Sequence, residues 1–174
     1  MQGKPLLVVV TGMPGSGKTS LATAIAQEIR CPLVSRDAIK EGILRTLGME
    51  RAADREVTHQ VYEAFFDNIE QLLKANVSLV AEAAFQHKVW FSKLELLQEI
   101  ADIRIIFCTI PPELASARRM LRAQKDPLFN QYHPDPVTKE TGEAPFEVLR
   151  MDVPTLSVDT TIEPNLPEIR AFLK

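Results

Sequence analysis

A glycine-rich octapeptide near the start of the chain constrains its fold more tightly than any other feature. Residues 12–19 read GMPGSGKT, which matches the pattern Gly-x-x-x-x-Gly-Lys-Thr, and they directly follow the apolar run of residues 6–10. A buried strand that turns through glycines into a helix directs several backbone N–H groups at one point, where they can bind a polyphosphate. The sequence therefore predicts a phosphate loop (residues 12–19) between the first strand and the first helix.

The residues of this loop predict ATP and Mg²⁺ as cofactors. The nucleotide is expected to contact the loop and the residue after it, namely Gly12, Met13, Pro14, Gly15, Ser16, Gly17, Lys18, Thr19 and Ser20. Lys18 is expected to act in catalysis by neutralising the β- and γ-phosphates, and the Thr19 hydroxyl is expected to bind Mg²⁺. A merely flexible glycine turn is the alternative, but apolar residues at helical spacing begin directly after the loop, which favours the phosphate site.

Composition favours a single domain that spans residues 1–174. The chain is 45% hydrophobic and has a formal net charge of −3, so it has no overall positive field for a nucleic-acid backbone. A nucleic-acid partner is therefore possible but disfavoured. No apolar stretch approaches the roughly 18 residues of a membrane span. We expect a cytoplasmic protein without a membrane partner, either a monomer or a homodimer.

The alternation of apolar strands with amphipathic helices predicts an α/β fold. The predicted strands cover residues 6–10, 33–35, 77–82, 102–110 and 155–159. The predicted helices cover residues 20–29, 38–47, 56–75, 89–101, 113–124 and 167–173. This order indicates a three-layer P-loop NTPase sandwich with a parallel five-stranded sheet. Residues 125–145 are rich in proline and have no clean period, so we expect them to form a lid.

Two acidic residues come directly after or at the end of predicted strands, where parallel sheets bind ligands. Asp37 is the candidate that orients or deprotonates an acceptor hydroxyl; its alternative role is the N-cap of the following helix. Glu82 could hold a Mg²⁺-bound water or the acceptor, or it could pair with a nearby Lys or Arg. No apolar run ends in the Asp typical of a Walker B element, so Asp37 and Glu82 would share that role.

The helix before the predicted lid contains two arginines that could reach the phosphates. Arg118 and Arg122 are four residues apart and so lie on one helical face. Lid closure could bring them to the transferred phosphoryl group as catalytic residues, and Arg122 could also stack on the adenine ring. A solvated helix face is the alternative for either arginine. His133, within the predicted lid, is a candidate for contact with the acceptor.

With these residues the chain resembles the small P-loop kinases, which include polynucleotide 5′-hydroxyl kinases, chloramphenicol phosphotransferase and zeta-toxin-like kinases. The likeness covers most of the chain, and its specific parts are GMPGSGKT and the SRDAIK segment of residues 35–40. The resemblance implies that Asp37 is the general base and that Lys40 contacts the acceptor where family members have arginine. It also implies that Glu82 is the strand-end acidic residue and that Arg118 and Arg122 are lid arginines.

The leading hypothesis is an ATP-dependent phosphotransferase that moves the γ-phosphate to a hydroxyl of a small-molecule acceptor. One alternative is a polynucleotide 5′-hydroxyl kinase, although nothing in the sequence resembles the basic tunnel that such enzymes use. A second alternative is a nucleotide-binding regulatory protein with weak ATPase activity. A switch of that kind would need a guanine-reading Asn-Lys-x-Asp motif, which the sequence lacks.

Overall fold

A five-stranded, all-parallel sheet forms the centre of the computed structural model, which describes residues 3–126, 128–133 and 148–174. The strands are β1 (Leu6–Gly12), β2 (Leu33–Ser35), β3 (Leu79–Glu82), β4 (Asp102–Thr109) and β5 (Thr155–Asp159). Their order across the sheet is β2-β3-β1-β4-β5, and every neighbouring pair is parallel. The predicted parallel five-stranded sheet is therefore confirmed.

Every helix predicted from the sequence is present among the described residues. These helices are α1 (Lys18–Ile29), α2 (Arg36–Leu47), α3 (Arg55–Lys74), α4 (His87–Leu97), α5 (Pro112–Lys125) and α7 (Leu166–Phe172). A 3₁₀ helix η1 (Met49–Arg51) and a one-turn helix α6 (Phe129–Tyr132) were not predicted. Segments of three or four residues are too short to show a helical period. No helix of the described residues is long and apolar enough to cross a membrane.

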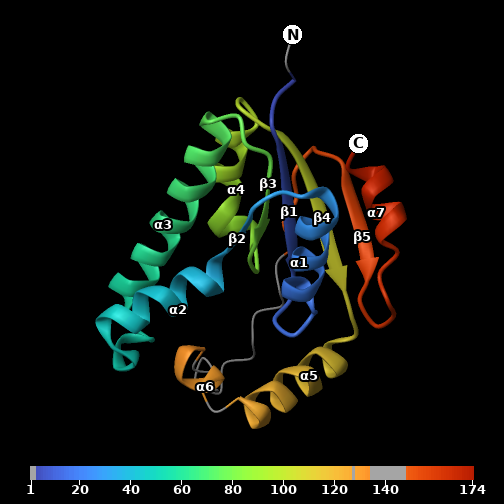
Figure 1. Cartoon of the computed structure of the whole chain (residues 1–174). Coiled ribbons are helices and arrows are strands. Elements are labelled where there is room, and N and C mark those ends of the chain that lie inside the picture. The colour runs from blue at the N-terminus through green and yellow to red at the C-terminus, as the bar shows by residue number, and fades with distance from the viewer. Residues whose placement is uncertain (1–2, 127, 134–147) are drawn as a thin grey trace.

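The helices cover both faces of the sheet, as the three-layer prediction requires (Figure 1). Strand β1 shows why, because its successive side chains point to opposite faces. Leu7 and Val9 pack into a core with residues of α3 and α4, whereas Val8 and Val10 pack into a second core with residues of α1 and α7. All four side chains are fully buried. Burial on both faces explains why β1 is apolar at consecutive positions rather than at alternate ones.

The carboxyl ends of the strands point to one end of the molecule, the lower end in Figure 1. There α5 and α6 lie below the sheet, and α6 packs near α2, where Tyr132 contacts a small core that includes Leu44 and Val61. Residues 125–145 were predicted as a lid. Residues 125–126 and 128–133 of that segment are described and contain α6; residue 127 and residues 134–145 lie outside the described residues.

The turn between β1 and α1 depends on glycine at position 15. Gly15 has φ 83°, in the left-handed region, and a Cβ there would overlap the backbone carbonyl of Ala115 in α5. Gly42, in the middle of α2, has no heavy atom within 4 Å of the corresponding position. A side chain is therefore excluded at position 15, whereas position 42 has room for one.

We expect Gly15→Ala and Gly42→Ala to change stability in opposite directions. Gly15→Ala should lower the free energy of unfolding by about 1–3 kcal/mol, because alanine is strained at this φ and its methyl group displaces α5. Gly42→Ala should raise the free energy of unfolding by about 0.5–1 kcal/mol, because alanine favours a helix interior. Urea denaturation of both variants measures the difference. Equal effects would contradict this account of the loop.

Candidate active site

The phosphate loop (residues 12–19) follows β1 and opens α1, as predicted from the sequence. Gly17 is the N-cap of α1 in a left-handed conformation, with φ 80°, and no side chain caps the helix. The first N–H groups of a helix lack partners within the helix, and here they border the loop. No acidic residue lies in the first turn of α1. This end of α1 is therefore suited to bind an anion such as a phosphate.

Strand pairing brings Glu82 next to this loop. In the sheet Val10 pairs with Glu82, so the end of β3 lies beside the end of β1. The following residue in β1, Thr11, is fully buried, and its Oγ1 accepts a hydrogen bond of 3.1 Å from the backbone N–H of Phe85. This bond fixes the segment after β3 against the base of the loop. Glu82 and Lys18 thus lie in one buried neighbourhood, although 64 residues separate them in the sequence.

Glu82 has an environment that is unusual for a carboxyl group. Its side chain is 1% exposed, and burial raises its pKa above the ordinary value, with a smaller effect in the same direction from Asp37. The Lys18 ammonium, the Ser35 hydroxyl and the Thr19 hydroxyl act in the opposite direction and lower this pKa. Ser35 Oγ donates a hydrogen bond of 2.9 Å to Glu82 Oε2, whereas Oε1 is buried without a hydrogen-bond partner. A buried, unpartnered oxygen needs a ligand or water to satisfy it.

Thr19 and Glu82 remain the predicted Mg²⁺ site, and their surroundings fit that role. The unpartnered Oε1 of Glu82 and the nearby Thr19 hydroxyl are oxygen ligands of the kind that Mg²⁺ prefers. Among the described residues, no three His, Cys, Asp or Glu side chains gather into a metal site. A Mg²⁺ ion here would therefore take most of its ligands from phosphates and water.

Asp37 is in the first turn of α2 and is half-exposed. The alternative role as N-cap of this helix is wrong, because the cap is Ser35, whose Oγ accepts from the Ala38 N–H at 3.5 Å. The Asp37 carboxylate instead lies 3.4 Å from Arg36 Nη1. Lys40 lies nearby and is half-buried; burial and the charge of Arg36 lower its pKa, and Asp37 partly offsets this. Helix capping therefore does not account for Asp37, and its role toward an acceptor hydroxyl remains a prediction.

A pocket of about 420 Å³ lies beside the phosphate loop, between α1, α5 and the segment after β5. Its walls include Leu21 and Ala24 of α1, Arg118 of α5 and Leu166 at the start of α7. Arg118 Nη2 donates a hydrogen bond of 2.9 Å to the backbone carbonyl of Thr160. Apolar walls with one guanidinium plane suit a flat heteroaromatic base. Three segments far apart in the sequence form this pocket, so no local motif could predict it.

The two predicted lid arginines have different surroundings. Arg118 lines the pocket, whereas Arg122 lies over the ring of Phe129 in α6, with 4.5 Å between the guanidinium carbon and the ring centroid. Arg122 is exposed and is not among the residues that line the pocket. The predicted stacking on adenine therefore fits Arg118 better. A catalytic role for either arginine stays a prediction.

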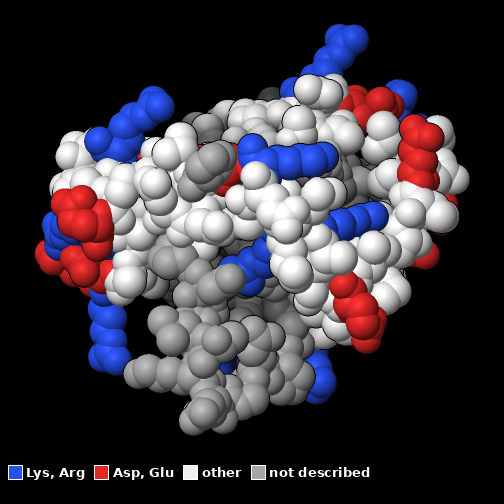
Figure 2. Space-filling model, turned by 90° about the horizontal axis from the view of Figure 1, so that it is seen from below, with Lys and Arg blue, Asp and Glu red and all other residues white. Residues whose placement is uncertain are grey.

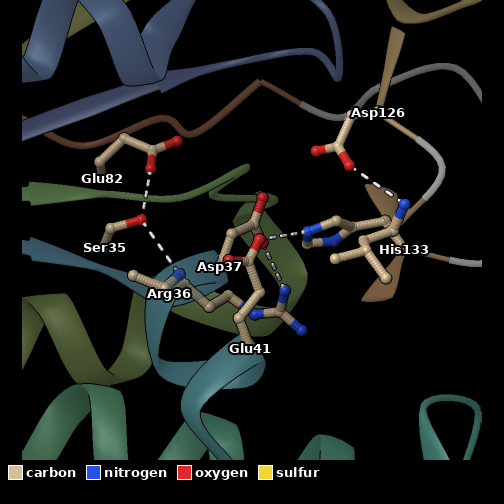
Figure 3. Close-up of polar contacts among 9 residues, drawn as sticks. Ser35, Arg36, Asp37, Glu41, Glu82, Asp126 and His133 are labelled. Atoms are coloured by element: carbon tan, nitrogen blue, oxygen red, sulfur yellow. Dashed lines mark hydrogen bonds and ion pairs between the residues drawn. The ribbon is translucent and has the colours of Figure 1, made fainter. Parts of the chain in front are cut away.

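His133 joins the end of α6 to α2, which the sequence did not predict. Its Nε2 lies 3.0 Å from Oε1 of Glu41, and its ring stacks near Phe129 with centroids 5.1 Å apart. Figure 3 shows the side chains of Asp37, Glu41 and His133 converging between these two helices. Glu41 was not a candidate from the sequence. Its spacing of four residues from Asp37 was the one available signal, because it puts both on one face of α2.

Charge is unevenly distributed over the end of the molecule that carries the site. Figure 2 shows this end, and several Lys and Arg side chains lie near the middle of the visible face around a hollow. Most of the visible Asp and Glu side chains lie toward its periphery. A chain with a net charge of −3 can therefore still present a local positive field to a polyphosphate.

The comparison with protein families agrees with this geometry. Residues 7–144 match the model of a family described as an AAA domain. The chain belongs to this family of P-loop kinases. No curated protein sequence matches the chain significantly.

Solved structures share the fold over most or nearly all of the chain. A candidate kinase from Chloroflexus aurantiacus is 25% identical with a TM-score of 0.84, and the match covers 99% of this chain and 100% of that one. The APS kinase of Mycobacterium tuberculosis, solved with AMPPNP and APS, is 16% identical with a TM-score of 0.64 and 99% of both chains covered. A chain of the Pnkp1/Rnl/Hen1 RNA repair complex is 21% identical with a TM-score of 0.61; 72% of this chain and 40% of that one are covered. The resemblance to small P-loop kinases is confirmed.

The raised pKa of Glu82 predicts how stability depends on pH. A carboxyl group whose pKa is higher in the folded state stabilises the fold while it is protonated, and this contribution is lost as pH rises through the folded-state pKa. We therefore expect Glu82→Gln, which cannot ionise, to match the parent in Tm near about pH 4. Above this pH its Tm should exceed that of the parent by a growing margin. The exposed Glu95→Gln is the control, and parallel curves for all three proteins would refute the expectation.

Proposed function

We propose that this protein is an ATP-dependent phosphotransferase that moves the γ-phosphate of ATP to a hydroxyl of a small-molecule acceptor. The observation that carries the proposal is the gathering of Lys18, Glu82 and Asp37 at the carboxyl ends of adjacent strands. Lys18 and Asp37 both lie close enough to shift the pKa of Glu82. A cation for the phosphates and a half-exposed carboxylate for the acceptor thus border one buried carboxyl group. These are the parts that phosphoryl transfer to an alcohol requires.

The pocket and the loop together give the nucleotide an orientation. A purine base in the pocket would contact Leu21, Ala24 and Arg118, and the phosphates would follow the loop toward Lys18. The γ-phosphate would then be on the side of Asp37. Thr19 and Glu82 would hold Mg²⁺, which would neutralise phosphate charge when bound. The APS kinase that shares this fold was solved with AMPPNP, an ATP analogue, which supports ATP as the donor.

The acceptor would enter beside the first turn of α2. Asp37 would accept a hydrogen bond from the hydroxyl and take its proton as the oxygen attacks the γ-phosphorus. The bond from this phosphorus to the β,γ-bridging oxygen would break, and ADP would leave. Most of the rate enhancement in such transfers comes from positioning and charge neutralisation, so Lys18 would contribute throughout while Asp37 would act on the acceptor alone.

A polynucleotide 5′-hydroxyl kinase is the second candidate, because the RNA repair chain shares the fold. The formal net charge of −3 argues against it, because the chain has no overall positive field for a nucleic-acid backbone. Incubation with labelled ATP separates the two candidates if small alcohols and a 5′-hydroxyl oligonucleotide are compared as acceptors. Transfer to the oligonucleotide alone would contradict the leading proposal. ATP hydrolysis that no acceptor stimulates would favour the regulatory alternative.

Lys18→Ala should abolish phosphoryl transfer and leave the fold intact. Lys18 neutralises charge on the transferred group, so we expect kcat/KM to fall by about 10³-fold or more. Circular dichroism and Tm should remain close to those of the parent. Lys74→Ala is the matched control, because Lys74 is exposed at the end of α3 away from the loop. A Lys18 variant within about tenfold of the parent would refute the proposed function.

Asp37→Asn should slow the chemical step without weakening ATP binding. Loss of a general base typically lowers kcat by about 10²-fold or more. Because Ser35 and not Asp37 caps α2, the substitution should leave stability nearly unchanged. Single-turnover rates at saturating ATP measure the chemical step, and Asp67→Asn on the exposed face of α3 is the control. Unchanged rates would assign the base to another residue.

A further inference from the structure

Thr160 directly follows the last strand of the sheet and contacts three other segments around the phosphate loop. Its backbone N–H donates to the Thr109 carbonyl at the end of β4 at 3.1 Å, and its own carbonyl accepts from Arg118 Nη2 at 2.9 Å. Its side-chain Oγ1 lies 2.6 Å from the carbonyl oxygen of Ser16 in the phosphate loop. The backbone of Thr160 is therefore held by β4 and α5, and its side chain is free to contact the loop.

The Thr160 hydroxyl has one proton to donate and two carbonyl oxygens within reach. The Ser16 carbonyl lies at 2.6 Å and the Thr109 carbonyl at 3.1 Å. The Thr109 carbonyl already accepts from the Thr160 backbone N–H, whereas within the described residues no other donor contacts the Ser16 carbonyl. The shorter bond thus goes to the carbonyl that has no other partner. The hydroxyl therefore serves the phosphate loop rather than the junction between β4 and β5.

This bond fixes the direction of one peptide unit in the loop. In a planar trans peptide the C=O of one residue and the N–H of the next point in opposite directions. With the Ser16 carbonyl directed at Thr160, the Gly17 N–H points away from Thr160, and no acceptor in the described part of the chain contacts it. An N–H without a protein partner at the start of a helix is a donor for a phosphate oxygen.

The peptide between Ser16 and Gly17 needs such a bond because of the glycine. Gly17 has φ 80°, and glycine adopts positive and negative φ about equally readily, so this peptide can rotate at little cost. Thr160 is close enough to oppose the rotation: a Cβ on Gly17 would lie 3.8 Å from the Thr160 Cβ and 3.6 Å from Arg118 Nη1. Without the hydroxyl, only the loop itself would orient the Gly17 N–H.

We propose that Thr160 is a positioning residue, whose hydroxyl holds the Ser16–Gly17 peptide so that the Gly17 N–H donates to a phosphate of the bound nucleotide. Thr160 acts through the loop and does not touch the reacting group. A donor that is oriented before the nucleotide binds requires no reorganisation during the reaction, so it contributes to both binding and transfer. The expected effect on transfer rests on the proposed function, whereas the effect on nucleotide binding does not.

Two substitutions separate the Thr160 hydroxyl from the rest of the side chain. Thr160→Val keeps the shape and removes the hydroxyl, whereas Thr160→Ser keeps the hydroxyl and removes the methyl group. Thr160→Val should raise the Kd for ADP about tenfold and lower kcat at saturating ATP about tenfold, while Thr160→Ser should stay within about twofold of the parent. Thr109→Val is the matched control, because Thr109 Oγ1 also donates to a carbonyl, that of Val158 at 3.2 Å, but this bond joins β4 to β5.

The Gly17 amide supplies a readout that a merely structural role of Thr160 would not change. In amide NMR spectra, addition of ADP should move the Gly17 proton downfield in the parent and in Thr160→Ser, because a new hydrogen bond to a phosphate oxygen deshields it. Thr160→Val should lose most of this shift, and Thr109→Val should keep it. All proteins are compared well below the Tm of the least stable variant, so that a loss of stability does not enter the comparison.

Several results would overturn the inference. They are a Kd for ADP in Thr160→Val equal to that of the parent, equal losses in Thr160→Val and Thr160→Ser or in Thr160→Val and Thr109→Val, and a full Gly17 shift in Thr160→Val. A parent that binds ADP but transfers phosphate to no acceptor would refute the proposed function alone, and the Kd and the Gly17 shift would still decide the role of Thr160. A parent that binds no ADP would overturn both.

Discussion

The close approach of two backbones, at Gly15 of the phosphate loop and Ala115 of α5, is the constraint on which the rest of the site depends. A side chain at position 15 would not fit against this carbonyl group, so the two segments can only meet through a glycine. Thr160 then links the same loop to the end of the sheet, because its Oγ1 donates to the Ser16 carbonyl at 2.6 Å and lies 3.1 Å from the Thr109 carbonyl. The phosphate loop is therefore held from two sides before any ligand binds, and such preorganisation favours catalysis.

This arrangement also joins the nucleotide side of the site to the acceptor side. Arg118, in the middle of α5, lines the pocket, and one turn later Arg122 contacts Phe129 of α6. The Phe129 ring lies tilted against the His133 ring, and His133 bonds to Glu41 of α2. A series of direct contacts thus runs from the pocket for the base to the helix that carries Asp37. Movement of α5 relative to the phosphate loop would therefore displace the contacts that reach α2.

Sequence patterns could predict the elements but not their partners. Strand β1, the phosphate loop and α1 are specified by residues close together in the chain, so the motif and the apolar period suffice to predict them. Ser35 and Asp37 are both residues that commonly cap helices, so local sequence does not decide between them. In the structure Ser35 is the cap, and its hydroxyl also bonds to Glu82, 47 residues away. Arg118 and Arg122 share a helical face, and only their contacts with distant residues distinguish them. Arg118 bonds to the Thr160 carbonyl, whereas Arg122 lies over the Phe129 ring. Glu41 and His133 are 92 residues apart, and no local pattern reports such a pair.

A crystal structure with Mg²⁺ and a non-hydrolysable ATP analogue tests the central claim most directly. The account predicts that the adenine lies in the pocket against Arg118 and Leu166, with the phosphates on the loop. It further predicts that the γ-phosphate lies between Lys18 and the Asp37 carboxylate. A base bound outside this pocket, or a γ-phosphate directed away from Asp37, would contradict it.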